Sequence, residues 1–141
     1  MKEIAGGVTS AKGFEAAGAE AAVKYKNRKD MALVYSTAPC KVAGTFTTNV
    51  VKAAPVLWDK QVVENSAFAQ AVVVNSGIAN ACTGKPGMDC CKAEAEHAGK
   101  LLGIPAEAVL VASTGVIGMA MPVDRLCAGI EKLVAAKAAT P

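Results

Sequence analysis

Apolar residues recur with two different periods along this chain, and the change between them predicts strands and helices in alternation. Short apolar runs rich in β-branched residues, bounded by turn formers, predict buried strands. Spacing of three and four residues predicts amphipathic helices with one buried face. The predicted strands cover residues 32–36, 42–48, 71–74 and 109–112, and the predicted helices cover residues 60–70, 88–102 and a last segment from Pro122.

Residues at the ends of these segments support the boundaries. Asp59 is a common N-cap residue type and is expected to cap the first helix. Gly103 follows the apolar stripe of the second helix and is expected to end it. Pro122 suits the first turn of the last helix. The alternation of strands and helices predicts an α/β protein with helices packed on sheet faces.

Composition narrows the class of protein. Of 141 residues, 52% are hydrophobic and 19% are charged, a balance that excludes disorder. A net charge of +3 without a basic stripe excludes a nucleic-acid-binding protein. No apolar run reaches membrane-spanning length and the charged start is no secretory signal, so a cytoplasmic protein is expected. The last helix runs to Pro141 without a closing strand, which indicates a single segment, residues 1–141, of a longer protein.

The cysteines predict neither a disulfide framework nor a metal site. Their number is odd and no CxxC pair occurs, so reduced core thiols are expected. The spacing of the central three cysteines relative to His97 matches no standard set of metal ligands. The five are Cys40, Cys82, Cys90, Cys91 and Cys127.

Residues 109–118 contain the most informative pattern, an apolar strand that runs into a small-residue turn with glycine. Glycine lets the backbone approach a ligand closely, since it has no Cβ. The Thr114 hydroxyl beside the Gly115 amide would supply two donors to a developing negative oxygen, as in an oxyanion hole. Such a turn also occurs without any function, and both interpretations stay open at this point.

Two asparagines follow the strand 71–74. Asn75 and Asn80 suit loops because their side chains satisfy nearby backbone groups. This structural role is favoured over a place in a substrate site.

Four segments in this order resemble the glutamate N-acetyltransferase (ornithine acetyltransferase) family of arginine biosynthesis. The resemblance covers residues 4–133, and its most distinctive parts are the Asn-Ser-Gly and Ser-Thr-Gly-Val-Ile-Gly blocks. The segments are Ser10-Ala-Lys-Gly-Phe14 with Ala16-Ala17-Gly18; Phe46-Thr-Thr-Asn49 with Ala53-Ala-Pro55-Val56; Val74-Asn75-Ser76-Gly77 with Ala79-Asn80-Ala81-Cys82-Thr83-Gly84; and Ser113-Thr-Gly-Val-Ile-Gly118 with Pro122.

The resemblance implies a layered α/β fold with paired sheets and a precursor that cleaves itself before a threonine. That threonine, the first residue of the second (beta) chain, takes an acetyl group from N-acetylornithine and passes it to glutamate. The resemblance also implies that no metal or organic cofactor is used, that some members accept acetyl-CoA as donor, and that the two-chain units assemble into higher oligomers.

Carried over residue by residue, the oxyanion-hole positions of the family fall on Thr114 and Gly115. The nucleophile lies beyond Pro141, and Thr140 is not assigned that role because the Lys-Gly-Ala-Thr type cleavage motif is absent. The chain is therefore expected to be active only together with the second chain. Ile78 departs from the asparagine common in the family, and it removes a polar group from this loop.

Two other functions stay open. One is an amidohydrolase or aminopeptidase of related architecture with a self-generated N-terminal nucleophile, in which water captures the acyl group. The other is a non-catalytic small-molecule binding domain that retains the fold.

Overall fold

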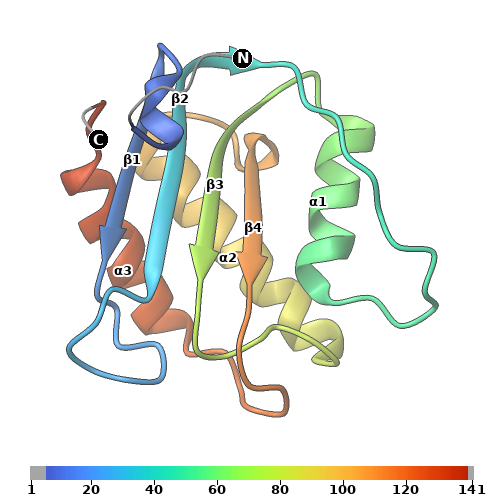
Figure 1. The fold of residues 1–141 in the computed structure, drawn as a ribbon. Coiled ribbons are helices and arrows are strands. Elements are labelled where there is room, and N and C mark those ends of the chain that lie inside the picture. The colour runs from blue at the N-terminus through green and yellow to red at the C-terminus, as the bar shows by residue number, and fades with distance from the viewer. Residues whose placement is uncertain (1–5, 140–141) are drawn as a thin grey trace.

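A computed structural model describes residues 6–139 and shows one four-stranded sheet (Figure 1). The strands stand in the order β1-β2-β3-β4; β1 pairs with β2 and β2 with β3 antiparallel, whereas β3 and β4 are parallel. The strands are β1 (Phe14–Ala19), β2 (Met31–Cys40), β3 (Ala69–Asn75) and β4 (Val109–Ser113).

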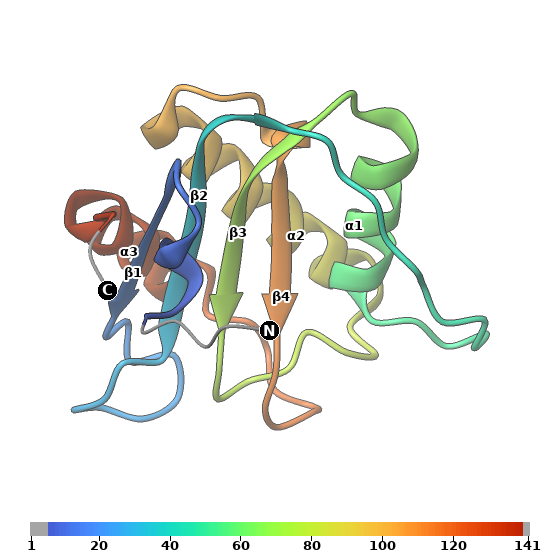
Figure 2. The ribbon, with the colours of Figure 1, turned by 45° about the horizontal axis from the view of Figure 1, so that its top comes forward.

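The helices lie on one face of the sheet and beside its β4 edge. Helices α2 and α3 run side by side behind the sheet, while α1 flanks β4 (Figures 1 and 2). Two short 3₁₀ turns, Val8–Ser10 and Ala106–Ala108, precede β1 and β4. The helices are α1 (Ala54–Asn65), α2 (Gly84–Leu102) and α3 (Val123–Ala136).

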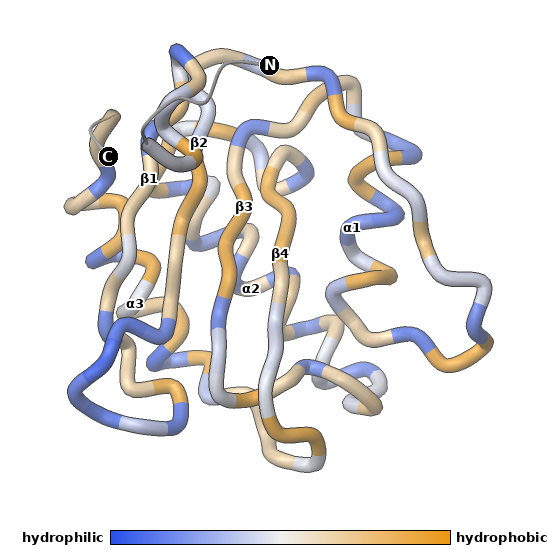
Figure 3. The backbone as a smooth tube through the Cα atoms, in the orientation of Figure 1, coloured by the Kyte–Doolittle hydropathy of each residue, from blue (hydrophilic) through white to orange (hydrophobic). Residues whose placement is uncertain are grey.

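The core lies between the sheet and the α2–α3 layer. Alternate residues of β3 are buried, as the period of two requires for a sheet covered on one face. Figure 3 shows the apolar stretches of β3 and β4 at the middle of the sheet. Gly129 lets α3 approach β2 closely, because a Cβ there would lie 2.4 Å from the Met31 sulfur. The largest fully buried apolar side chains are Leu33, Leu126, Ile130, Leu133, Val23, Val73, Val109 and Val111.

Most of the predicted elements are confirmed. Strands occur over 32–36, 71–74 and 109–112, each inside a longer observed strand, and β2 continues four residues past its predicted end to Cys40. The second helix begins at Gly84, four residues before its predicted start, and ends as predicted at Leu102, followed by Gly103 in the left-handed conformation (φ 70°). The last helix begins at Val123, directly after Pro122, but its predicted continuation to Pro141 is wrong: it ends at Ala136, because Lys137 is extended and Ala138 pairs with Ala16 of β1. The α/β class is therefore confirmed, and the described residues form a single sheet with one helical layer.

The predicted strand over residues 42–48 is wrong. The segment has no regular secondary structure. Its β-branched residues favour a strand, but a strand also needs a neighbour that offers free backbone groups. Strand β2, which precedes the segment, is already paired on both sides by β1 and β3.

The predicted helix over residues 60–70 with Asp59 as its cap is also wrong in its bounds. Helix α1 begins six residues earlier, with a proline in its first turn, and ends at Asn65. Asp59 lies inside the helix and accepts a hydrogen bond from the Val111 backbone N–H (2.9 Å). The Trp58 indole N–H donates to the Val109 carbonyl (2.9 Å). Helix α1 therefore satisfies backbone groups along the outer edge of β4.

Candidate active site

The turn after β4 lies against the turn after β3, since these two strands are parallel and end at the same edge. The Thr114 N–H donates to the Asn75 carbonyl (3.1 Å), and the Val116 N–H donates to the Gly77 carbonyl (3.1 Å). Ala79 in turn donates to the Val116 carbonyl (3.0 Å). These bonds extend the parallel pairing of β3 and β4 past the ends of the strands.

Gly115 occupies a position that only glycine fits. Its φ is +133°, and a Cβ on it would lie 2.3 Å from the carbonyl carbon of Gly77. A side chain is excluded both by conformation and by contact. The backbone that Gly115 approaches in this chain is that of the turn after β3. The close approach of a ligand to this turn stays a prediction.

The two candidate donors are adjacent and open to solvent. Thr114 and Gly115 are both exposed. Within residues 6–139, neither the Thr114 hydroxyl nor the Gly115 N–H donates a hydrogen bond to a protein atom. Both donors lie outside the packed interior. The backbone N–H groups of Thr114 and Val116, on either side of Gly115, are held by hydrogen bonds to the turn after β3. This arrangement leaves both donors available to a negative oxygen.

The asparagines after β3 hold the loop from inside. Asn75 and Asn80 are buried, at 0% and 1% exposure. The Asn75 amide donates to the Ile78 carbonyl (3.0 Å), and the Asn80 amide donates to the Gly87 carbonyl (2.9 Å). The Thr83 hydroxyl donates to the Asn80 side-chain oxygen (2.6 Å). The favoured structural role fits both residues.

The Ile78 side chain belongs to the core. It is 3% exposed and packs in the main hydrophobic cluster. It lies outside the lining of the cavity beside the turn. An apolar side chain suits this buried environment, whereas an unpaired amide there would be costly.

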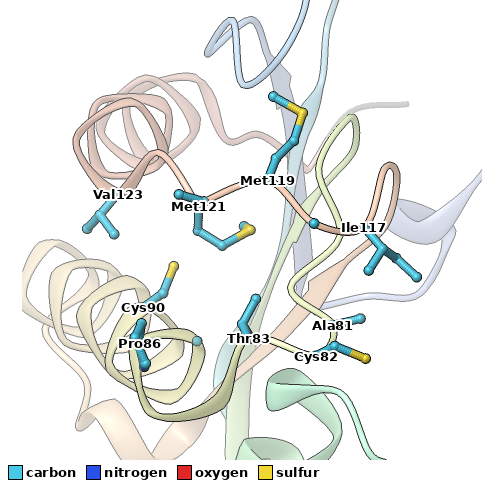
Figure 4. A pocket seen from close by; sticks show the side chains of 12 residues that line it. Ala81, Cys82, Thr83, Pro86, Cys90, Ile117, Met119, Met121 and Val123 are labelled. Atoms are coloured by element: carbon cyan, nitrogen blue, oxygen red, sulfur yellow. The ribbon is translucent and has the colours of Figure 1, made fainter.

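A cavity of about 400 Å³ opens between the start of α2 and residues 117–121, next to the Thr114–Gly115 turn in the chain (Figure 4). Its lining is largely apolar, and the Cys90 thiol and Met121 extend toward one another within it. The labelled side chains around it include Thr83, Pro86, Cys90, Ile117, Met119, Met121 and Val123.

The thiols of α2 are unsuited to act as nucleophiles. Burial raises the pKa of the Cys90 thiol, and the neighbouring Glu94 carboxyl adds to this effect. Burial likewise raises the pKa of Cys91 to about 12. Both thiols stay protonated at neutral pH, and the thiolate is the reactive form. Glu94 itself is fully buried, and burial raises its pKa to about 7.

His97 and the cysteines, whose spacing was compared with metal-ligand patterns, have different surroundings. His97 Nε2 faces Glu131 Oε1 (3.2 Å) across the α2–α3 surface, and Cys82 is exposed. All five cysteines are free. Over residues 6–139 no three His, Cys, Asp or Glu side chains group as metal ligands, and no helix there has the length and apolar content to cross a bilayer.

Comparison with known proteins shows the family to which the chain belongs. The ArgJ family model matches residues 15–140. An arginine biosynthesis bifunctional protein ArgJ from Streptomyces coelicolor is 52% identical over 125 residues, which cover 88% of this chain and 32% of the relative. The protein of the same name from Thermotoga neapolitana is 49% identical over 124 residues, covering 87% of this chain and 31% of the relative.

Two crystal structures share the fold. Ornithine acetyltransferase from Mycobacterium tuberculosis, complexed with ornithine, is 43% identical with a TM-score of 0.89, covering 94% of this chain and 72% of that chain. ArgJ from Bacillus halodurans is 41% identical with a TM-score of 0.88, covering 96% of this chain and 69% of that chain. The chain spans about a third of the length of the curated relatives it matches. On the family match and these identities, the chain belongs to the ArgJ family.

Proposed function

We propose that this chain is the N-terminal part of a self-processed acetyltransferase of arginine biosynthesis, in which Thr114 and Gly115 form the oxyanion hole. The enzyme moves an acetyl group from N-acetylornithine to glutamate and releases ornithine and N-acetylglutamate. The observation that carries the proposal is the pair of adjacent, exposed and unpartnered donors on a turn fixed by backbone bonds.

The chemistry uses these donors twice. The hydroxyl of the N-terminal threonine of the second chain attacks the acetyl carbonyl, and its own amine accepts the proton. The carbonyl oxygen becomes negative in the tetrahedral intermediate, where each donor contributes roughly 3–4 kcal/mol. Ornithine leaves with a proton and an acetyl-threonine ester remains. The glutamate amine then attacks that ester through a second oxyanion at the same place. The ester C–O bond breaks, N-acetylglutamate leaves, and the threonine hydroxyl regains a proton that the attacking amine gives up.

The lengths of the relatives support a protein of two chains. This chain covers 69% of the solved Bacillus halodurans chain but 31% of the curated Thermotoga neapolitana relative. The solved chain is thus a little under half as long as the curated relative. A precursor divided near its middle accounts for this ratio. The beta chain from the same precursor is accordingly the proposed partner.

The test uses the complete two-chain protein with Thr114→Ala. We expect kcat to fall roughly 100-fold or more with folding intact, because one oxyanion donor is lost. Thr114→Ser restores the hydroxyl and should recover most of the activity. Thr37→Ala is the matched control, since Thr37 is an exposed threonine near the opposite end of the sheet. Wild-type turnover in Thr114→Ala would contradict the proposal.

The acceptor is tested separately. We expect ornithine to be released from N-acetylornithine in proportion to the glutamate supplied. Acetate released at the same rate without glutamate would instead favour a hydrolase. Replacing N-acetylornithine with acetyl-CoA tests the proposed second donor.

A further inference from the structure

Asn75 connects the turn after β3 with the turn after β4, at the carboxyl ends of these two strands. It is the last residue of β3, is fully buried, and stands in register with Ser113 of β4. Its main-chain carbonyl accepts the Thr114 N–H (3.1 Å), while its side-chain amide donates to the Ile78 carbonyl (3.0 Å). One residue thus holds the turn that follows its own strand and the turn that follows the neighbouring strand.

These bonds determine where the Gly115 amide lies. The residue before Gly115 is held by the Asn75 carbonyl, and the residue after it is held by the Gly77 carbonyl (3.1 Å). Gly77 belongs to the turn that the Asn75 side chain closes. Because Gly115 packs directly against the Gly77 backbone, a shift of Gly77 moves Gly115 as well.

The Asn75 side chain is retained at a cost in solvation. Its Oδ1 is buried without a hydrogen-bond partner among the described residues, and so is the Ser113 Oγ of the paired position. A buried unpaired oxygen is unfavourable, and an apolar side chain of similar shape would avoid it. The amide donor to Ile78 is therefore the property that an apolar replacement would lose.

We propose that Asn75 is a positioning residue for the Thr114 and Gly115 donors, an inference that rests on the proposed function. Asn75 touches no substrate in this role. It acts by fixing the two turns against each other, and its loss displaces donors that must meet a transition-state oxygen at short range. Misplacement of about 1 Å in a catalytic group costs roughly 100-fold in rate.

Asn80 provides a matched control in the same loop. It is equally buried and its amide also donates to a backbone carbonyl, that of Gly87 (2.9 Å). Its oxygen is satisfied by Thr83, however, and its contacts lead to the start of α2 rather than to Gly115. Loss of Asn80 therefore removes a buried amide of the same kind without releasing the donor turn.

The experiment compares Asn75→Ala, Asn80→Ala, Thr114→Ala and the Asn75→Ala/Thr114→Ala double variant in the complete two-chain protein. Thermal unfolding defines a temperature at which each is folded, and kcat and KM are measured there. We expect Asn75→Ala to lower kcat roughly 10-fold or more with KM within about threefold, because the donors act in the transition state. Asn80→Ala should keep kcat within about threefold of wild type. The fold-loss of kcat in the double variant should be at least about fivefold smaller than the product of the fold-losses in the two single variants, since both changes act on one group of donors.

The outcomes separate the two proposals. Wild-type turnover in Thr114→Ala overturns the proposed function itself. A loss in Thr114→Ala with wild-type kcat in Asn75→Ala overturns the positioning role alone. Equal losses in Asn75→Ala and Asn80→Ala, or single losses that multiply fully, show a merely structural asparagine and also overturn it. Should Asn75→Ala not fold, Asn75→Leu keeps the branched shape, removes the unpaired oxygen and takes its place in the same comparison.

Discussion

The loops after β3 and β4 lie together at one edge of the sheet, yet they differ in burial and bonding. The loop after β3 has buried residues at Ile78, Ala79 and Asn80, and its asparagine side chains bond to main-chain carbonyls. The loop after β4 is exposed from Thr114 through residue 120. The first loop is held by the core, and the second takes its position from the first.

This difference shows how a turn can be rigid while its polar groups stay free. A loop that satisfies its own donors is stable but offers nothing to a ligand. The turn at Thr114 and Gly115 is fixed instead by backbone bonds on either side of Gly115. Preorganised donors of this kind need no rearrangement when charge develops on a substrate.

Gly115→Ala is the most direct way to break the contact between the loops. The new Cβ meets the Gly77 backbone at 2.3 Å, and the φ of +133° is strained for alanine. We expect destabilisation by roughly 3 kcal/mol. Turnover should fall roughly 100-fold or more, because the donor amide is displaced. Thermal unfolding and kcat of the complete two-chain protein measure the two effects.

Gly103→Ala is the control for this change. Gly103 also has a positive φ (+70°), but nothing lies within 4 Å of its added Cβ. It ends α2 and takes no part in the proposed site. We expect a cost of roughly 1 kcal/mol and unchanged kcat. Equal effects of the two alanines on kcat would show that the contact between the loops does not matter for activity.

The sequence predicted those parts of the fold that depend on local pattern. The buried strand around Val73, the apolar face of α2 and the glycine stop at Gly103 follow from periodicity and backbone preference alone. The turn at Gly115 was predicted for a related reason, because a close backbone approach requires glycine.

Contacts between residues far apart in the chain could not be predicted from the local sequence pattern. The bond from Val111 to Asp59 spans 52 positions, so nothing local marks Asp59 as a partner of β4 rather than a helix cap. The strand predicted over 42–48 lacked only a free neighbour, which the sheet order determines. The burial of Glu94 was also missed, since a glutamate in an amphipathic helix ordinarily predicts the exposed face.

Glu94→Gln extends the comparison of buried and exposed groups to helix α2. Burial raises the pKa of Glu94 to about 7 in the folded protein, well above the ordinary glutamate pKa of 4.5. A raised pKa in the folded state means that stability is full below about pH 4.5 and falls as the pH rises to about 7, where the buried carboxyl ionises. Glutamine cannot ionise. We expect the variant to lose less stability than wild type between pH 5 and pH 8, by roughly 2 kcal/mol.

Denaturant unfolding of the complete protein at several pH values measures this slope. Glu96→Gln is the control, because Glu96 lies two positions along the same helix and is exposed. The slope of Glu94→Gln is compared with that of Glu96→Gln, which makes the same carboxyl-to-amide change on the exposed face. Identical slopes for Glu94→Gln and wild type would mean that Glu94 ionises freely in the folded protein.

The smallest expected effects are changes in stability at the point where the two loops pair. Ile78 and Val116 form a bridge between the loops, but Ile78 is 3% exposed and Val116 is 44% exposed. Ile78→Val removes one buried carbon and should cost about 1 kcal/mol. Val116→Ala removes two carbons from an exposed side chain and should cost less than about 0.5 kcal/mol. Chemical denaturation of both variants in the complete protein decides the order. A larger loss for Val116→Ala would mean that the exposed loop is packed in the assembled enzyme, and that the second chain covers the turn at this residue.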